Sequence, residues 1–259
     1  MSDLRLERKD DVLAITLNRP DKLNALSESM KQGLIDTLTA EARSPSARAV
    51  LIRANGRGFC VGADLQPDRI MARRETIGQE LEAGVNVIVS LLRQLPVPVI
   101  AAVNGAAAGA GFSLALAADM VVAAESATFR LAFSRIGAVL DGGASHFLTR
   151  RLGTSRAMAL AMLGESLSAA EAHDLGLVYR ITADDELART AGELAQTLAR
   201  GPSVALGLIK QQLNTAEAHS LEDSLAFEAV CQGKAFLTQD FEEGVSAFLA
   251  KRPPRFAGK

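Results

Sequence analysis

The chain has 259 residues, of which 48% are hydrophobic and 22% are charged, and its formal net charge is −2. This length suffices for one large α/β domain with a sizeable core, and the composition is typical of a soluble globular protein. Neither the total charge nor its pattern shows the basic stripe of a nucleic-acid binder, so we expect no nucleic-acid partner.

Cys60 and Cys231 are the only cysteines. Two cysteines are too few for a disulfide framework, and they indicate a reducing compartment. The N-terminus lacks the apolar segment of a signal peptide, and no stretch of about 20 apolar residues is free of charge. We therefore expect a cytoplasmic protein with no membrane partner.

The first half of the sequence alternates strand, loop and helix. Residues 4–17 predict two short strands around a charged turn. Ser27 is a plausible N-cap for a helix that follows it. Further along, we expect strands at 47–54, 98–105, 120–126 and 128–133, a glycine-broken loop at 56–66, and helices at 69–95 and 109–119.

The second half is predicted to be almost entirely helical. The repeated strand-loop-helix step before it indicates an α/β fold with parallel strands. We therefore predict a core domain over 1–200 and a C-terminal helical region over 201–259, with a possible hinge at 195–205. The expected helices are 153–164, 169–176, 186–200, 204–215, 221–233 and a last one closed by Pro253–Pro254, with one strand at 177–181.

Two loops place small residues where a strand hands over to a helix: FCVGADLQ (59–66) and NGAAAGAGFSL (104–114). The first N–H groups of a helix have no partner within it and favour negative charge. Two such ends side by side would offer two N–H donors to one oxygen, as in an oxyanion hole. Spacing alone favours the plainer explanation, that the glycines and alanines only allow tight helix–strand packing. GAGFSL does not complete the dinucleotide fingerprint.

Four stretches together carry a family resemblance: NRPDKLNAL, GRGFCVGADL, AAVNGAAAGAGFSLALAAD and GVSAFLAKRPPRFAGK. In this order along the chain, they resemble the crotonase family of enoyl-CoA hydratases and isomerases. The resemblance implies a spiral of ββα units, C-terminal helices that assemble a trimer, and in many members a dimer of trimers. It also implies an acyl-CoA thioester as substrate and no separate cofactor, because the coenzyme A belongs to the substrate.

The resemblance also assigns roles to individual residues. The thioester oxygen would be held by the backbone N–H groups of Ala63 and Ala110. The carbonyls of Ala25, Val61 and Leu65 match those that surround the adenine. Phe248 and Lys251 match residues that reach the coenzyme A of a neighbouring subunit, although a solvated lysine is the plain alternative for Lys251.

The family's hydratases use two glutamates, and this chain carries Ser113 and Phe133 at those positions. Adding water to a double bond needs groups that position and deprotonate the water, which neither side chain does. Asp141, in GAVLDGGAS, stands where several isomerase members carry an aspartate. An Asp-Gly turn or a helix cap is the alternative explanation for Asp141.

The resemblance therefore favours an acyl-CoA isomerase with Asp141 as its acid and base. The fragments AFSRIG and LGLIKQQLN are similar to the branch that isomerises ring-1,2-epoxyphenylacetyl-CoA and shifts 3-enoyl-CoA to 2-enoyl-CoA. Apolar neighbours, Val139 and Leu140, would raise the pKa of Asp141 by desolvation. A hydratase that uses Asp141, and a family member that binds acyl-CoA or RNA without catalysis, stay open as alternatives.

Other candidate groups carry weaker signals. His146 lies near Asp141 and Ser145, which leaves a hydrolase open, but no G-x-S-x-G elbow exists. His146 is otherwise a pocket residue or a polar core residue. Cys60 is expected to be a packing residue, and no Cys/His cluster suits a metal. Residues 67–76 carry several arginines, either as a phosphate contact or as a solvated helix face.

Overall fold

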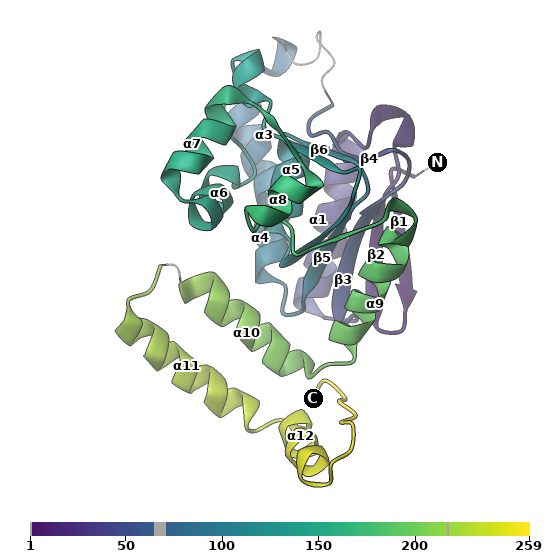
Figure 1. Cartoon of the computed structure of the whole chain (residues 1–259), viewed down its shortest axis with the longest axis vertical. Helices are drawn as coiled ribbons and strands as arrows, with labels where there is room; N and C mark the ends of the chain where they lie inside the picture. The colour runs from purple at the N-terminus through teal and green to yellow at the C-terminus, as the bar shows by residue number, and fades with distance from the viewer. Residues whose placement is uncertain (1, 65–70, 217) are drawn as a thin grey trace.

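The structure is a computed structural model that describes residues 2–64, 71–216 and 218–259. Its body contains two β-sheets covered by helices (Figure 1). The larger sheet has the strand order β1-β2-β3-β5-β7-β10, and the smaller has the order β4-β6-β8-β9. Only the β1–β2 and β8–β9 pairs are antiparallel within these two sheets; every other pair is parallel.

The strands of the larger sheet are β1 (Leu4–Lys9), β2 (Val12–Leu17), β3 (Ala49–Ala54), β5 (Val99–Val103), β7 (Met120–Ala124) and β10 (Arg180–Thr182). Those of the smaller sheet are β4 (Gly58–Cys60), β6 (Ala106–Ala108), β8 (Thr128–Arg130) and β9 (Ser166–Ser168). Consecutive strands β3–β4, β5–β6 and β7–β8 each place one strand in either sheet. This alternation is the repeated ββα arrangement that the sequence predicts.

The helices of the body are α1 (Glu28–Arg43), α3 (Ile77–Ala83), α4 (Val85–Gln94), α5 (Ala110–Ala117), α6 (Ala144–Leu152), α7 (Thr154–Leu163), α8 (Ala169–Asp174) and α9 (Leu187–Ala199). Beyond them lie α10 (Ser203–Ala216), α11 (Leu221–Ala235) and α12 (Gln239–Leu249). The predicted cap of α1 is confirmed, since the Ser27 side chain accepts a hydrogen bond from the Met30 N–H at 3.1 Å. None of the described helices is both long and apolar enough to cross a membrane.

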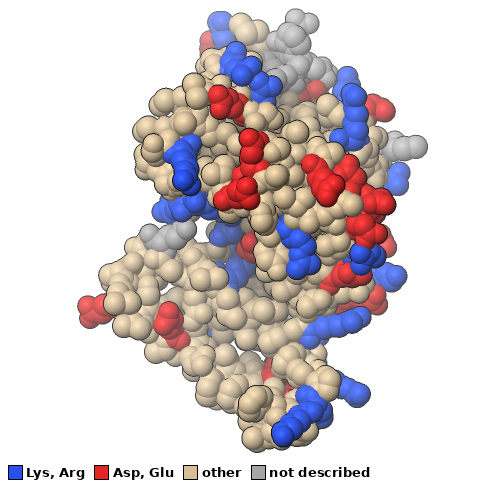
Figure 2. All heavy atoms as spheres, viewed as in Figure 1, with Lys and Arg blue, Asp and Glu red and all other residues tan. Residues whose placement is uncertain are grey.

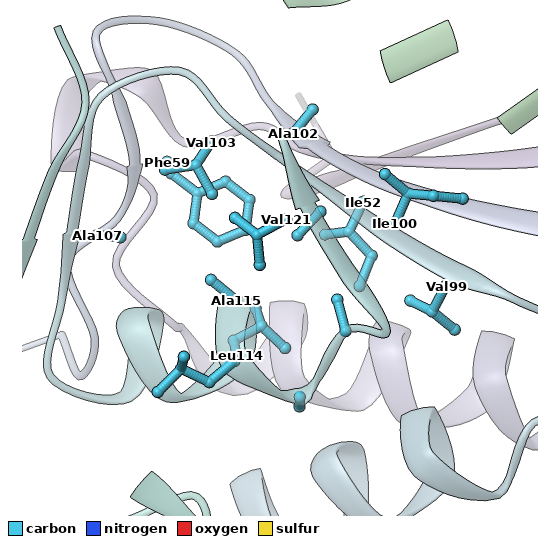
Figure 3. Close-up of a cluster of buried hydrophobic side chains, with 14 of the residues drawn as sticks. Ile52, Phe59, Val99, Ile100, Ala102, Val103, Ala107, Leu114, Ala115 and Val121 are labelled. Atoms are coloured by element: carbon cyan, nitrogen blue, oxygen red, sulfur yellow. The ribbon is translucent and has the colours of Figure 1, made fainter. Parts of the chain in front are cut away.

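The core is built from small and branched aliphatic side chains between the sheets and α5. Every residue of α5 is buried, and the sequence of the helix, AGFSLALA, is apolar or small on every face, as expected of a helix inside a core. Figure 3 shows Leu114 and Ala115 of α5 beneath Val103 and Val121 of the larger sheet, with the Phe59 ring of β4 beside them. Helix α5 is therefore fixed by packing, which in turn fixes the position of its first turn.

Several predicted elements differ from those observed. The loop predicted at 56–66 contains β4, and β6 and β9 were not predicted, because three-residue strands are too short to show a hydrophobic period. The helix predicted at 69–95 is divided at Gly84 into α3 and α4, and its first residues lie outside the described residues. Helix α6 was also missed, and the strand predicted at 177–181 lies at 180–182.

Residues 203–259, which we call the C-terminal arm, extend beyond the body at its lower end (Figure 1). The arm docks through α10. A methyl group on Gly207 would lie 2.3 Å from the carbonyl oxygen of Pro96, so only glycine allows this approach. The division of the chain into 1–200 and 201–259 stays a prediction.

Lys210 is the buried cation of this contact. Its ammonium group donates to the carbonyl oxygens of Leu92 at 2.8 Å and Val97 at 3.1 Å, and lies 2.8 Å from a carboxylate oxygen of Asp119. Burial lowers the pKa of Lys210, and the Asp119 carboxylate acts against that shift. These partners satisfy the charge and bind α10 to the end of α4.

We predict that Lys210→Met destabilises the fold by about 2–4 kcal/mol, because it removes the buried cation that Asp119 and two carbonyl oxygens share. Urea unfolding at pH 7 measures this change. Lys22→Met is the matched control, since Lys22 is exposed, and it should leave the free energy of unfolding within about 0.5 kcal/mol. Equal effects of the two substitutions would contradict a stabilising role for Lys210.

Candidate functional site: two backbone loops and a buried carboxyl

The loop that follows β4 lies directly against the start of α5. A methyl group on Gly62 would lie 3.1 Å from the amide nitrogen of Ala110 and 3.0 Å from the carbonyl oxygen of Ala108. A methyl group on Gly111 would lie only 2.0 Å from the carbonyl oxygen of Cys60. The glycines therefore serve tight packing, and the same packing brings the backbones at Ala63 and Ala110 together.

The N–H groups of Ala63 and Ala110 are the two candidate donors of the site, and neither is needed for a backbone hydrogen bond between described residues. Leu26 forms a parallel bridge with Ala63 and donates to the carbonyl oxygen of Gly62 at 2.8 Å, so the Ala63 N–H points away from Leu26. Ala110 opens α5, and its N–H has no acceptor one turn earlier in the helix. Within the described residues, neither N–H donates a hydrogen bond.

Asp141 lies beside the same helix. Its carbonyl oxygen accepts hydrogen bonds from the Ser113 hydroxyl of α5 and from the Ala144 N–H, each at 3.0 Å. Two glycines with positive φ, Gly142 at 53° and Gly143 at 79°, then turn the chain into α6. Asp141 is thus held one helical turn from Ala110.

The side chain of Asp141 is half-buried, and its oxygen Oδ1 is buried with no hydrogen-bond partner among the described residues. Burial raises the pKa of this carboxyl from 3.8 to about 6. Leu140 packs partly against the core, as expected, but Val139 is 83% exposed. The expectation that Val139 desolvates the carboxyl is therefore wrong for this chain, because its side chain points into solvent.

Ser113 and Phe133, the positions at which the family resemblance implies glutamates in hydratases, both lie near this site. Ser113 is fully buried, and its hydroxyl also contacts the carbonyl oxygen of Gly109 at 3.4 Å. The ring of Phe133 lies beside Gly109, where a methyl group would be 3.5 Å from Cζ of the ring. The site thus has a hydroxyl and a phenyl ring where two carboxylates would otherwise stand.

The structure brings together two of the three residues whose carbonyls are expected around the adenine. The Val61 N–H donates to the carbonyl oxygen of Leu23 at 3.2 Å, two residues before Ala25, and the carbonyl oxygen of Ala25 accepts from Arg19 at 2.7 Å. Leu65 lies outside the described residues. Arg19 also pairs with Asp64 at 2.9 Å, which ties this loop to the one that carries Ala63.

Asn24 organises this region, and the sequence reasoning missed it. Its side chain is fully buried and donates to the carbonyl oxygens of Asn55 at 2.9 Å and Gly58 at 2.8 Å, and it accepts from the Arg19 N–H at 2.7 Å. Its φ of 56° is the left-handed conformation that asparagine tolerates. The polar run NRPDKLN around a buried position is the signal that would have revealed it.

Helix α12, which contains Phe248 and precedes Lys251, lies at the far end of the molecule from α5 (Figure 1), so one chain does not bring these two residues to Asp141. Phe248 is 82% exposed. Lys251 has a φ of 51° and follows α12 at a position usually taken by glycine. Its N–H donates to Phe248 and that of Arg252 to Ala247, at 3.1 and 3.0 Å, which closes the helix.

The remaining candidates have structural partners or lie at the surface. Burial raises the pKa of Cys60 to about 12, so its thiol stays protonated and packs. His146 is exposed, with its ring edge-on to Phe147 at 5.4 Å, and it is not a core residue. Arg73 pairs with Glu28 at 2.9 Å and with Glu80. Within the described residues, no group of three His, Cys, Asp or Glu side chains is placed to hold a metal.

The chain matches the enoyl-CoA hydratase/isomerase family over residues 7–259. It belongs to this family. The predicted resemblance is therefore confirmed, and it covers nearly the whole sequence, including the two glycine-rich loops and Asp141.

Members of the enoyl-CoA hydratase/isomerase family with different activities are similar to this chain. It is 45% identical to the 1,2-epoxyphenylacetyl-CoA isomerase of Escherichia coli K12, over 96% of this chain and 95% of that protein. It is 37% identical to the 2,3-dehydroadipyl-CoA hydratase of the same organism, over the full length of both chains. It is 32% identical to the trans-2-decenoyl-[acyl-carrier-protein] isomerase of Streptococcus mutans, over 96% and 95%.

Solved structures of family members share the fold. The enoyl-CoA hydratase of Bacillus anthracis superimposes with a TM-score of 0.94 at 31% identity, covering 99% of this chain and 100% of that one. The enoyl-CoA hydratase/isomerase of Cupriavidus metallidurans CH34 gives 0.92 at 31% identity, with 100% and 97% covered. The α/β spiral of the family, including its C-terminal helices, is therefore the fold of this chain.

The raised pKa of Asp141 predicts a pH-dependent penalty on stability. A carboxyl whose pKa rises on folding stabilises the fold below its unfolded pKa of 3.8, and this contribution is lost as the pH rises through about 6. Asp141→Asn removes the ionisation. We expect the variant to be more stable than the native protein by about 1–3 kcal/mol at pH 8, and the difference to vanish near pH 4.

Unfolding midpoints of both proteins between pH 4 and pH 8 measure this difference. Asp21→Asn is the control, because Asp21 is exposed. A difference between Asp141→Asn and the native protein that does not change with pH would contradict the burial of an ionising carboxyl.

Proposed function

We propose that this protein is an acyl-CoA isomerase. It shifts the double bond of 3-enoyl-CoA to 2-enoyl-CoA, or isomerises ring-1,2-epoxyphenylacetyl-CoA to oxepin-CoA, or both. The thioester enolate is held by the N–H groups of Ala63 and Ala110, and Asp141 is the acid and base. The observation that carries this proposal is the buried, unpartnered carboxyl oxygen of Asp141 beside α5, with no carboxylate at positions 113 and 133.

The proposed reaction begins with polarisation of the thioester carbonyl by the two N–H groups. Preorganised donors stabilise the charge that develops on this oxygen, and losing one such donor typically lowers the rate by about 10²–10³. Stabilising the enolate makes the α-proton more acidic. The two alanines supply only backbone groups, so the site depends on the position of the chain rather than on side chains.

Asp141 then removes the α-proton, and the electron pair of the C–H bond moves into the dienolate. The same carboxylic acid returns the proton to the γ-carbon, which leaves the double bond between the α- and β-carbons. One carboxyl group suffices because no water is added. A pKa near 6 suits this role, since the group is ionised at neutral pH and is still basic enough to accept a carbon-bound proton.

On a ring epoxide, the same enolate would open the three-membered ring and lead to expansion to an oxepin. The epoxide isomerase of Escherichia coli supports this version, being 45% identical. The ring of Phe133 gives the site an apolar wall beside Gly109, which suits an aromatic or unsaturated acyl group better than a water molecule.

The same proposal covers the substrate's coenzyme A. The carbonyls of Ala25, Val61 and Leu65 would surround the adenine, and Phe248 and Lys251 would reach the coenzyme A of a neighbouring subunit in a homotrimer or a dimer of trimers.

The proposal also covers the assembly. Exposed apolar side chains on the arm support it: Ile209, Leu213, Leu225, Val230, Leu237, Phe248 and Leu249. Figure 2 shows few charges over α10 and α11. The buried, unpaired cysteines fit a cytoplasmic setting.

An activity panel tests the proposal against its alternatives. The purified protein is given 3-hexenoyl-CoA, crotonyl-CoA and ring-epoxidised phenylacetyl-CoA in separate assays. We expect isomerisation of the first or third substrate and little hydration of crotonyl-CoA. Hydration as the main activity would support the hydratase alternative, whereas saturable acyl-CoA binding without α-proton exchange would support a non-catalytic member.

We predict that Asp141→Asn lowers kcat for isomerisation by about 10³-fold or more, because it removes the only group proposed to carry the proton. Binding of an unreactive acyl-CoA should change little, since the amide is isosteric. Calorimetry with a saturated acyl-CoA checks binding, and the rate on 3-hexenoyl-CoA checks catalysis. Turnover at the native rate in this variant would exclude the proposed mechanism.

The strained conformation of Lys251 gives a further prediction. Lys251→Gly should stabilise the fold by about 1 kcal/mol, because glycine adopts a φ of 51° without strain. If Lys251 binds a neighbour's coenzyme A, the same variant should raise KM about tenfold through the lost charge–phosphate contact.

Lys251→Arg is the matched control for charge, and we expect it to keep KM near the native value. An unchanged KM in Lys251→Gly would leave the lysine as a solvated residue and contradict the proposed contact.

A further inference from the structure

We infer that Phe147, whose ring contacts the guanidinium groups of Arg93 and Arg151, is a positioning residue that fixes the turn carrying Asp141. Through Arg93, this ring also connects the C-terminal arm to the proposed catalytic carboxyl. The inference rests on the proposed function for its kinetic consequence, but the structural link can be tested independently of turnover.

Asp141 needs positioning because no hydrogen bond to its Oδ1 orients the carboxyl. That oxygen is buried without a partner among the described residues. The orientation of the side chain must therefore come from the backbone turn and its packing. The turn itself has two successive glycines at positive φ, Gly142 and Gly143, which on their own allow many conformations.

Phe147 packs against this turn. A methyl group on Gly143 would lie 3.0 Å from Cε2 of the Phe147 ring, so the ring fills the space beside the glycine backbone. The N–H of Phe147 donates to the carbonyl oxygen of Gly143 at 3.0 Å, in the first turn of α6. The ring is buried. Its position therefore limits how far the turn can move.

Two cations hold the ring in place. The guanidinium carbon of Arg93 lies 5.7 Å from the ring centroid, and that of Arg151 lies 5.8 Å from it. Both distances are within the range of a cation–π contact. Each guanidinium is fixed elsewhere: Arg151 donates to the carbonyl oxygen of Leu116 at 2.9 Å, and Arg93 pairs with Asp119 at 3.2 Å.

Arg93 extends this network to the arm. It donates to the side-chain oxygen of Asn214 in α10, and the Asn214 side chain donates back to the carbonyl oxygen of Arg93 at 3.0 Å. Asp119, the partner of Arg93, also pairs with Lys210 of the same helix. The docking of α10 and the packing of Phe147 thus depend on the same arginine.

The test is Phe147→Leu, which keeps an apolar side chain but removes the aromatic ring that the two cations contact. We expect kcat on 3-hexenoyl-CoA to fall at least tenfold while KM changes less than about twofold, since misplacing a reacting group by about 1 Å has effects of this order. Phe241→Leu is the matched control, because it makes the same change at a ring that stacks on Phe236 at 3.9 Å, in α12, which lies at the far end of the molecule from α5 (Figure 1). It should leave kcat within about threefold.

A second readout separates this inference from the proposed function. In protein labelled with ¹³C at its aspartate carboxyls, Asp141 is the signal missing from Asp141→Asn. Its titration midpoint should lie near 6 in the native protein and in Phe241→Leu, and it should move toward 3.8 in Phe147→Leu. This shift would support the positioning role even if the protein proves not to isomerise acyl-CoA.

Arg151→Gln covers the case in which Phe147→Leu does not fold. It keeps a donor for Leu116 but removes one cation from the ring, and it should shift the same Asp141 signal in the same direction by a smaller amount. An unchanged Asp141 midpoint in the folded variants, or equal losses of kcat in Phe147→Leu and Phe241→Leu, would overturn the inference.

Discussion

The close approach of two backbones, at Cys60–Gly62 and at Gly109–Gly111, is the constraint on which the rest of this structure depends. No side chain larger than hydrogen fits at Gly111, because the carbonyl oxygen of Cys60 occupies the space. The three-residue strands β4 and β6 pair in parallel just before this contact and hold the two segments together. The N–H groups of Ala63 and Ala110 thus come from segments that the fold itself keeps adjacent, and a rigid pair of donors is what stabilising a developing oxyanion requires.

The same helix connects these donors to the carboxyl. Ser113, one turn beyond Ala110, uses its hydroxyl to hold the backbone of Asp141. At a position where the family resemblance implies a glutamate in hydratases, this chain therefore has a residue that fixes the neighbouring turn. A second carboxylate here would stand close to Asp141, and like charges in a buried site oppose ionisation. With serine at 113 and phenylalanine at 133, Asp141 is raised in pKa by burial alone. A single proton carrier in an apolar site is consistent with moving a double bond rather than adding water.

The sequence revealed the features that have a local signal. Ser27 before an amphipathic segment predicts the N-terminus of α1, and the aliphatic runs predict β3, β5 and β7, because cap chemistry and long hydrophobic stretches are properties of neighbouring residues. The short strands β4, β6 and β9 have no such signal, since only their pairing across the chain defines them. The burial of Asn24 and the exposure of Val139 also depend on distant segments. The roles of Asp141, Ala63 and Ala110 came from the family resemblance, and local pattern alone left Asp141 as a turn residue.

The fragment LGLIKQQLN, residues 206–214, forms the part of α10 that docks the C-terminal arm on the body. Gly207, Lys210 and Asn214 follow one another at helical spacing on the face of α10 that meets the body. Ile209 and Leu213 lie on the exposed side of the helix. The polar groups thus face inward and the apolar groups outward, the reverse of an ordinary surface helix. Polar contacts specify where α10 sits, whereas the outward apolar face is free to meet another subunit. Arg93 and Asp119 receive those polar contacts, and Arg93 also contacts the ring of Phe147. A subunit bound to the outward face of α10 would therefore be connected, through Arg93, to the side chain that we infer positions the Asp141 turn.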